Sequence, residues 1–395
     1  MRATILVIDS FGIGEAPDAA AYGDVGSNTA LHICERIPGE KWPTLASLGL
    51  GNASLLLGNG LPGCGEIERP AASYGVMVER SPGKDTTTGH WELAGIELPR
   101  PFHTFPPGPP SFPPELIEAF KRAIGRGILG DKAASGTVII EELGAEHMRT
   151  GLPIVYTSSD SVFQIAAHEE VIDPSELYRM CEIARGLCDP YQVGRVIARP
   201  FVGRPGSFTR TSGRRDFSIA LPEKSLLDHL AGAGVRTIGV GKIGDIFNEQ
   251  GIVESHHDKG NPACLERTIE LLRKPSASRG ELIFVNLVDT DMVYGHRRDV
   301  QGYFDAVSAV DAGVRRMLPV LPNGDLLIIS ADHGCDPTFK GSDHTREHVP
   351  LLVYRAGRPG RSLGVRKGYY DVARTLAELF QVDGLLRGSS FAEFL

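Results

Sequence analysis

Short apolar runs alternate with amphipathic stretches in the first quarter and the last half of the chain. The apolar runs at 4–10 (TILVIDS), 281–289 (ELIFVNLVD) and 325–332 (DLLIISAD) each predict a strand that is buried on both faces. Helical spacing of apolar residues predicts the helices between them. These helices cover 27–36, with Ser27 as N-cap, 224–234, 264–274 and 302–318, and a further strand covers 235–242. The alternation predicts an α/β fold with a mainly parallel sheet that is flanked by helices.

A different pattern separates these two parts of the chain. The stretch 97–114 (ELPRPFHTFPPGPPSFPP) is rich in proline, which is typical of a linker. Predicted helices (114–125 and 174–187) and strands (153–158, 162–168 and 194–202) follow, and then a polar, glycine-rich stretch at 203–216. We expect residues 1–99 and 220–395 to form one core domain, interrupted by an inserted α+β domain of residues 100–219.

The amino-acid composition indicates which classes of binding partner suit the protein. With 395 residues the chain exceeds one ordinary hydrophobic core, and 42% hydrophobic and 23% charged residues are typical of a folded protein. The balance of 41 basic against 49 acidic residues argues against a broad nucleic-acid surface and allows a small anionic substrate. No apolar run is long enough for a signal peptide or a membrane span, and the six cysteines include no CxxC pair. We expect a cytoplasmic protein with reduced thiols and no membrane partner; the oligomeric state stays open.

Acidic residues follow three of the predicted buried strands. In parallel sheets, binding sites form at the edge where the carboxyl ends of the strands lie. Acidic residues from distant parts of the sequence can therefore meet there. Histidines accompany these acids. The candidate metal ligands are Asp9, Asp289, Asp291, His296, Asp332, His333 and His344. Any one of them could instead be a helix cap or a structural residue, but their combination favours a metal site.

Carboxylates together with imidazoles suit two divalent transition ions, Mn or Zn, better than Mg²⁺, which prefers oxygen ligands. Two such ions carry +4 and three carboxylates −3, so the site keeps about +1 while the ligand histidines are neutral. Such a site attracts a phosphoryl group.

The stretch GKDTTTGHWE (83–92) offers three hydroxyl groups. Beside two metal ions a threonine hydroxyl can be ionised and can attack phosphorus. The alternative is a capped helix start, in which Asp85 or a threonine accepts backbone N–H bonds. The two interpretations are compatible, because amides at a helix start also stabilise phosphate.

Several long stretches carry a family resemblance. They include DSFGIGEAPDA, GKDTTTGHWE, ASGTVIIEELG, PIVYTSSDSVFQIAAHEE, GRVIARPFVG, NLVDTDMVYGHRRD and ADHGCDPTFKGSDHTREHVPLL. With these, the chain resembles the prokaryotic phosphopentomutases of the alkaline phosphatase superfamily nearly from end to end. The resemblance implies an alkaline-phosphatase-like core with an inserted cap domain, and interconversion of ribose 1-phosphate and ribose 5-phosphate and of their 2-deoxy forms.

The resemblance also implies roles for individual residues. It implies two manganese ions, one held by Asp291, His296 and His344 and the other by Asp9, Asp332 and His333. It implies Thr86 as the nucleophile, phosphorylated by a sugar bisphosphate activator such as glucose 1,6-bisphosphate. The small phosphorylated pentose would be bound by Asp160, Arg195, Arg210 and Lys242. Two positions depart from the family pattern, Cys335 and Phe339, and neither is a matched ligand.

Three other functions are possible for this sequence, and each can be distinguished from a phosphopentomutase by one observation. A metal-dependent phosphatase of the same superfamily would release phosphate to water. A cofactor-independent phosphoglycerate mutase would use serine and act on 3-phosphoglycerate. A metal-storing or interaction module without catalysis would usually lack a ligand or the nucleophile, whereas all are present in this sequence.

Overall fold

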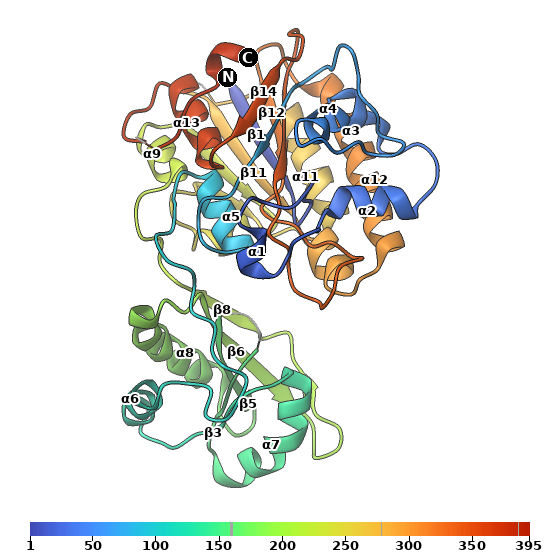
Figure 1. Cartoon of the computed structure of the whole chain (residues 1–395). Coiled ribbons are helices and arrows are strands. Elements are labelled where there is room, and N and C mark those ends of the chain that lie inside the picture. Colours follow the sequence, from blue (N-terminus) through green and yellow to red (C-terminus); the bar gives the residue numbers. More distant parts are fainter. Residues whose placement is uncertain (159–160, 278, 386) are drawn as a thin grey trace. The chain divides into compact units, whose positions relative to one another are not determined.

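The chain forms two compact units in a computed structural model (Figure 1). The structure describes residues 1–158, 161–277, 279–385 and 387–395. The first unit consists of Met1–Arg100 and Leu221–Leu395, and the second of Pro101–Ala220. The substrate-recognition role expected for the inserted part stays a prediction.

An eight-stranded sheet forms the centre of the first unit. Its strands are β1 (Arg2–Ile8), β2 (Ser73–Met77), β9 (Arg236–Val240), β10 (Glu254–His256), β11 (Glu281–Leu287), β12 (Leu326–Ser330), β13 (Val349–Arg355) and β14 (Ser362–Arg366). The order is β10-β9-β11-β1-β12-β13-β2-β14, parallel from β10 to β12, with β13 antiparallel to both its neighbours. Every residue of β1, β11 and β12 is buried, which explains their continuous apolar sequence. The predicted mainly parallel sheet is confirmed.

Helices flank the sheet on both faces (Figure 1). On one side lie α2 (Thr29–Arg36), α3 (Pro43–Ser47), α4 (Leu50–Leu55), α11 (Asn261–Arg273) and α12 (Val300–Met317). On the other lie α5 (Thr86–Leu93), α9 (Leu226–Gly232), α10 (Ile243–Ile246) and α13 (Tyr370–Leu379). The short helix α1 (Ala19–Tyr22) precedes α2.

The expected N-cap of helix α2 was wrong. Asn28, not Ser27, caps α2, and its side chain accepts from the Leu31 N–H at 3.1 Å. The Asn28 N–H itself donates to the carboxylate of Asp336, 308 residues away. Since both residues are good caps, this tertiary bond decides where the helix begins.

The second unit is a separate α/β layer structure. Its strands are β3 (Leu129–Ala133), β4 (Ile154–Thr157), β5 (Val162–His168), β6 (Arg195–Val202), β7 (Thr209–Arg210) and β8 (Arg215–Ser218), in the order β3-β4-β5-β6-β7, with β8 also paired to β6. Its helices are α6 (Pro114–Ile124), α7 (Gly136–Thr150) and α8 (Pro174–Cys188). Helices α6 and α8 share a core with one face of the sheet, and α7 covers part of the other. The sequence pattern did not predict α7, β3, β7 and β8; strands β7 and β8 have only two and four residues.

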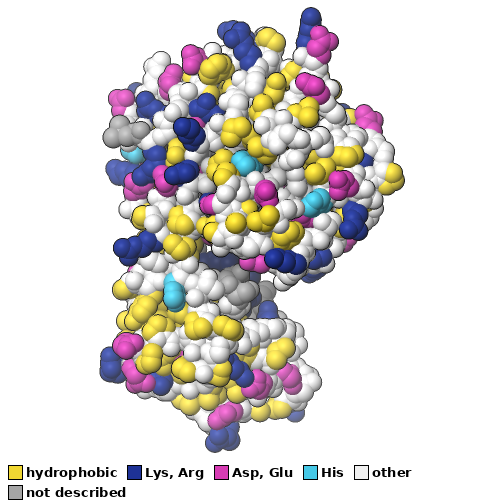
Figure 2. Space-filling model, in the orientation of Figure 1, with side chains coloured by type: hydrophobic (Ala, Val, Ile, Leu, Met, Phe, Trp, Pro, Cys, Tyr) yellow, Lys and Arg dark blue, Asp and Glu magenta, His cyan; other side chains and the backbone are white. Residues whose placement is uncertain are grey.

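Two general features concern the helices and the surface charges of the described residues. None of the helices in the described ranges combines the length and the apolar character that crossing a membrane requires. On the face drawn in Figure 2, acidic and basic side chains lie interspersed.

Candidate functional site

Three neighbouring parallel strands deliver carboxylates to one edge of the large sheet. Asp9 directly follows β1, Asp332 lies two residues after β12, and Asp291 lies in a π-helical turn, Thr290–Gly295, after β11. The register places β11 and β12 on either side of β1. The three acids therefore meet because their strands are neighbours, although they are up to 323 positions apart in sequence.

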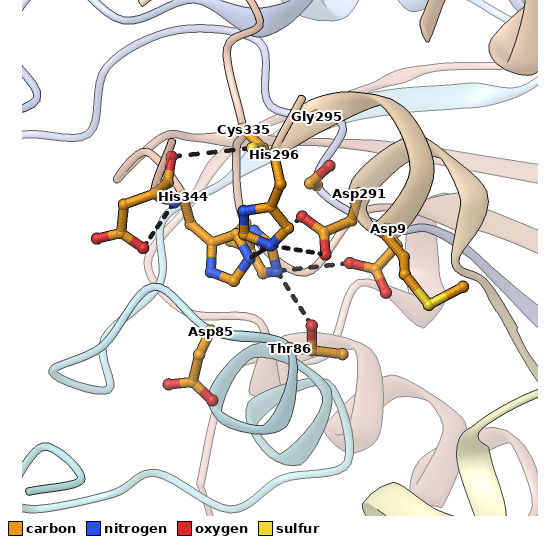
Figure 3. Close-up of polar contacts among 12 residues, drawn as sticks. Asp9, Asp85, Thr86, Asp291, Gly295, His296, Cys335 and His344 are labelled. Atoms are coloured by element: carbon orange, nitrogen blue, oxygen red, sulfur yellow. Dashed lines mark hydrogen bonds and ion pairs between the residues drawn. The ribbon is translucent and has the colours of Figure 1, made fainter. Parts of the chain in front are cut away.

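Asp291, His296 and His344 form one group of possible ligands (Figure 3). Nε2 of His344 lies 3.1 Å from Oδ1 of Asp291, and Nε2 of His296 lies 3.4 Å from Oδ2. The two Nε2 atoms are 3.1 Å apart. Nδ1 of His296 donates to the Ser342 carbonyl at 2.7 Å, which leaves Nε2 as the acceptor that a metal ion requires.

Asp9, Asp332 and His333 form the second group. Ligand atoms of these three residues lie within 4.8 Å of one another. Nε2 of His333 is 3.5 Å from Asp9 and 3.4 Å from Asp332, and its Nδ1 donates to the Gly334 carbonyl. The rings of His333 and His344 are 4.1 Å apart, so the two groups adjoin.

The carboxylate oxygens of both groups fit divalent cations. Oδ1 of Asp9, Oδ1 of Asp291 and Oδ2 of Asp332 are buried and make no hydrogen bond among the described residues, and their polar neighbours are imidazole nitrogens 3.1 to 3.5 Å away. Three carboxylates buried this close together are costly, and cations compensate for them. Buried carboxylates beside imidazole Nε2 atoms are the donor set that Mn²⁺ and Zn²⁺ accept.

The pKa values of these groups show how strongly they interact. Burial, and then the charges of Asp332 and Asp291, raise the pKa of Asp9 well above its usual value. Burial would also raise the pKa of Asp332, but His333 and His90 outweigh it and lower it to about 2. Burial opposes protonation of His344, yet the Asp291 charge raises its pKa to about 10. Without metal, His344 is therefore held as a cation by the carboxylates.

Thr86 is the threonine that faces this cluster. Its hydroxyl oxygen lies 3.3 Å from Nε2 of His333, as Figure 3 shows. Asp85 caps helix α5 by accepting from the Thr87 and Thr88 N–H groups at 3.1 and 3.2 Å, and the Thr88 hydroxyl also donates to Asp85. The capping interpretation of this stretch is therefore confirmed for Asp85, and Thr88 belongs to the cap.

His90 is a contact of the site to which sequence reasoning assigned no role. It is fully buried, one helical turn after Thr86, and its Nδ1 lies 2.8 Å from the Thr86 carbonyl and 3.2 Å from Oδ2 of Asp332. It thus ties the start of α5 to a candidate ligand. The spacing of four residues in a capped helix was the signal that could have identified it.

Arg346 connects two loops of the site and was also missed. Its guanidinium pairs with the carboxylate of Glu79, donates to the carbonyls of Ser81 and Gly83 at 2.9 and 2.5 Å, and pairs with Asp18 at 3.0 Å. Arg346 is 1% exposed. Through these bonds the segment that carries His344 holds the segment that leads to Thr86.

Cys335 lies next to the first group of ligands. Its sulfur and ligand atoms of Asp291 and His296 fall within 4.8 Å of one another, and Arg298 donates to it at 3.5 Å. Burial raises the pKa of this thiol well above its usual value. A buried, protonated thiol is the inert form.

The remaining expected site residues lie elsewhere. Asp160 is outside the described residues. Arg195 starts β6 and Arg210 ends β7 in the second unit, whereas Lys242 follows β9 in the first unit. Lys242 directs its ammonium towards Met292 at 3.8 Å, and its charge offsets a small part of the rise in the pKa of Asp9 that burial causes. Asp289 accepts from the Asn261 N–H at 2.8 Å and is not in a candidate metal group.

Comparison with known proteins places the chain in a family. The model described as the metalloenzyme superfamily matches residues 1–384. A phosphopentomutase of Caldanaerobacter subterraneus subsp. tengcongensis is 54% identical over 392 residues, which are 99% of this chain and 97% of that protein. A phosphopentomutase of Alkaliphilus metalliredigens is 50% identical over 396 residues, 100% of this chain and 99% of that protein.

One solved structure aligns with nearly the whole chain. The PH0037 protein from Pyrococcus horikoshii aligns with 96% of this chain and 97% of its own, with 14% identity and a TM-score of 0.48. From the family model and the two curated relatives, the chain is an enzyme that belongs to the metalloenzyme superfamily and, within it, to the phosphopentomutase family.

Proposed function

We propose that this enzyme interconverts α-D-ribose 1-phosphate and D-ribose 5-phosphate, and the 2-deoxyribose equivalents, through a phosphorylated Thr86. The observation that carries the proposal is the position of the Thr86 hydroxyl, 3.3 Å from His333 at the edge of the two ligand groups. Near-full-length identity of about one half to named phosphopentomutases supports the substrate class.

Two divalent ions, which we propose to be Mn²⁺, would be held by the two groups of ligands. We assign Asp291, His296 and His344 to one ion and Asp9, Asp332 and His333 to the other. When bound, the ions would lower the pKa of the threonine hydroxyl and neutralise phosphoryl oxygens. The buried oxygens of Asp9, Asp291 and Asp332 that make no hydrogen bond among the described residues support this assignment.

The start of helix α5 has a second part in the proposal. Thr86 is its first residue, so backbone N–H groups and the positive end of the helix dipole lie beside the hydroxyl. A phosphoryl group on Thr86 would be stabilised there. Asp85 and His90, which bond the first turn, would hold the hydroxyl in position.

The proposed cycle conserves the phosphoryl groups. An activator such as glucose 1,6-bisphosphate first loses a phosphoryl group to Thr86. The phosphothreonine then passes this group to the free hydroxyl of the pentose phosphate; the Thr86 O–P bond breaks, a new sugar O–P bond forms, and the hydroxyl proton ends on the departing threonine oxygen. The pentose bisphosphate turns, and its other phosphoryl group returns to Thr86.

The substrate residues of the proposal come from both units. Asp160 would accept bonds from ribose hydroxyls, and Arg195, Arg210 and Lys242 would bind the distal phosphate. The inserted unit would thereby recognise the substrate and keep water from the phosphothreonine. We propose that the enzyme is cytoplasmic, because its phosphorylated substrate would be present in that compartment.

One assay separates this function from its alternatives. Full-length protein, loaded with Mn²⁺ and activated by glucose 1,6-bisphosphate, is expected to convert ribose 1-phosphate to ribose 5-phosphate with little free phosphate. Stoichiometric release of phosphate would support the phosphatase instead. Activity on 3-phosphoglycerate would support a phosphoglycerate mutase, and two bound metal ions without any turnover would support a non-catalytic metal-binding protein.

A further inference from the structure

Strand β11 has a polar side chain in the middle of its apolar run. Asn286 stands between Val285 and Leu287 in the sequence LIFVNLV (282–288), and it is 0% exposed, like the apolar residues on either side. Burying an amide costs free energy unless hydrogen bonds compensate for it. An apolar residue would suit this buried strand better, so the fold alone does not explain an asparagine at this position.

The amide of Asn286 contacts the carboxylate of Asp9 on the neighbouring strand. Its Nδ2 donates to Oδ2 of Asp9 at 2.9 Å. Since an ionised carboxylate can only accept, the nitrogen is the end of the amide that faces it. The register pairs Asn286 with Val7, two positions before Asp9, so strand pairing brings the two side chains together. Oδ1 of Asn286 is buried, and in the described part of the chain the bond to Asp9 is the only one that this side chain makes.

Strand β11 and the turn after it also hold the backbone of Asp9. The Asp9 N–H donates to the Leu287 carbonyl at 3.1 Å, and the Asp9 carbonyl accepts from the Thr290 hydroxyl at 2.6 Å. With the backbone fixed and Oδ2 bonded to Asn286, Oδ1 is the oxygen that lies near Nε2 of His333, at 3.5 Å. Oδ1 makes no hydrogen bond among the described residues. One oxygen of Asp9 is therefore occupied, and the other is available to a cation.

A neutral donor suits this position for an electrostatic reason. A lysine or arginine could also bind Oδ2 of Asp9, but its positive charge would repel a metal ion a few ångströms away. The amide of Asn286 occupies the same oxygen without changing the charge of the ligand group. Partners of this kind fix the orientation of a ligand, and their loss typically weakens metal binding about 10- to 100-fold.

We infer that Asn286 is a positioning residue of the metal centre, whose amide fixes the carboxylate of Asp9 so that Oδ1 alone is presented to the ion of the second group. That this group holds an ion rests on the proposed function. The inference gives strand β11 a part in both ligand groups. It leads to Asp291 of the first group, and through Asn286 it orients Asp9 of the second.

The test measures metal binding to the full-length protein after a chelator has removed its metal. Calorimetric titration with Mn²⁺ should show two ions per parent chain. In Asn286→Leu, whose side chain branches at the same carbon, one ion should bind about 10- to 100-fold more weakly and the other should bind nearly as in the parent. Thr4→Val is the matched control, because Thr4 is also a fully buried polar residue of the large sheet and its hydroxyl bonds no ligand. This variant should bind both ions as the parent does.

The variant Asp9→Ala separates positioning from a structural role. Asn286 acts through Asp9, so adding Asn286→Leu to this variant should leave the binding of the remaining ion unchanged within about 2-fold. The amide then has no carboxylate to bond, so its replacement by leucine should raise the melting temperature of the metal-free chain. A lower melting temperature, or weaker binding of the remaining ion, would show that Asn286 serves the fold and would overturn the inference.

A second substitution makes the test independent of how leucine packs. Asn286→Ala removes the amide without adding apolar volume, and it should weaken binding of the same ion. If the parent binds two ions and both Asn286 variants bind them equally tightly, the inference is wrong and the proposed metal site stands. A parent chain that binds no Mn²⁺ would reject the proposed site together with the inference.

Discussion

The hydroxyl oxygen of Thr86 lies 3.3 Å from Nε2 of His333, and this contact joins a helix start to a strand end 247 positions away. Thr86→Ala should reduce isomerase activity more than about 1,000-fold, because the proposed nucleophile is removed. Both metal ions should remain bound, since Thr86 is in neither ligand group.

Intact mass and peptide mapping after incubation with glucose 1,6-bisphosphate show directly whether Thr86 carries the phosphoryl group. Thr87→Ala is the matched control and should still gain one phosphoryl group. Phosphorylation of another threonine in the Thr86→Ala protein would contradict the assignment.

The ion pair between Arg346 and Glu79 should be important for both stability and activity. Arg346→Met leaves Glu79, 3% exposed, without its partner and should lower the free energy of unfolding by about 3–5 kcal/mol. It should also lower kcat, because the bonds to the Ser81 and Gly83 carbonyls position the segment before Thr86.

Chemical denaturation of Arg346→Met and of the double variant Arg346→Met with Glu79→Gln separates these effects. The second substitution removes the unpaired carboxylate and should recover stability but not kcat. Equal kcat in parent and double variant would show that Arg346 has no positioning role.

Metal uptake should release protons. The pKa of His344 is raised to about 10 without metal, so this side chain is cationic at pH 7, whereas a ligand histidine must be neutral. Calorimetric titration of the metal-free chain with Mn²⁺ in two buffers of different ionisation enthalpy should show at least one proton released per chain. His344→Asn should release about one proton fewer; no release from the parent would contradict the ligand assignment.

His147 should make the second unit less stable in acid. Its Nδ1 donates to the Leu152 carbonyl at 2.7 Å and its Nε2 accepts from the His168 N–H at 2.8 Å, so the folded form is neutral. Burial lowers the pKa of His147 from its usual 6.5. Below pH 6.5 the unfolded chain therefore binds one proton more than the folded chain, and stability falls as the pH falls, by at most about 1.4 kcal/mol per pH unit.

Hydrogen exchange of amides in β5, next to His168, reports this change in the second unit. Protection should decrease as the pH falls below 6.5, after correction for intrinsic exchange. In His147→Gln the titrating group is absent, so its contribution to the pH dependence should disappear. An unchanged pH dependence in that variant would assign the effect to other groups.

The sequence by itself determined four neighbouring strands of the eight-stranded sheet, β1, β9, β11 and β12, and the set of candidate ligands. Buried parallel strands need continuous apolar residues, and these runs occur locally in the sequence of β1, β11 and β12. Asp85 could be read as a cap because capping involves residues two and three positions on. The family resemblance, not the spacing, selected Thr86 among the three threonines.

Only the tertiary structure decided the contacts between distant segments. Asn28 replaces Ser27 as a cap because Asp336 binds its N–H, and Arg346 reaches Glu79 across 267 positions. Likewise, Tyr156 and Arg210 meet the start of α7 through strand pairing in a sheet whose shorter strands had no local signal. Such bonds depend on where the backbone brings side chains together, and no local periodicity encodes that.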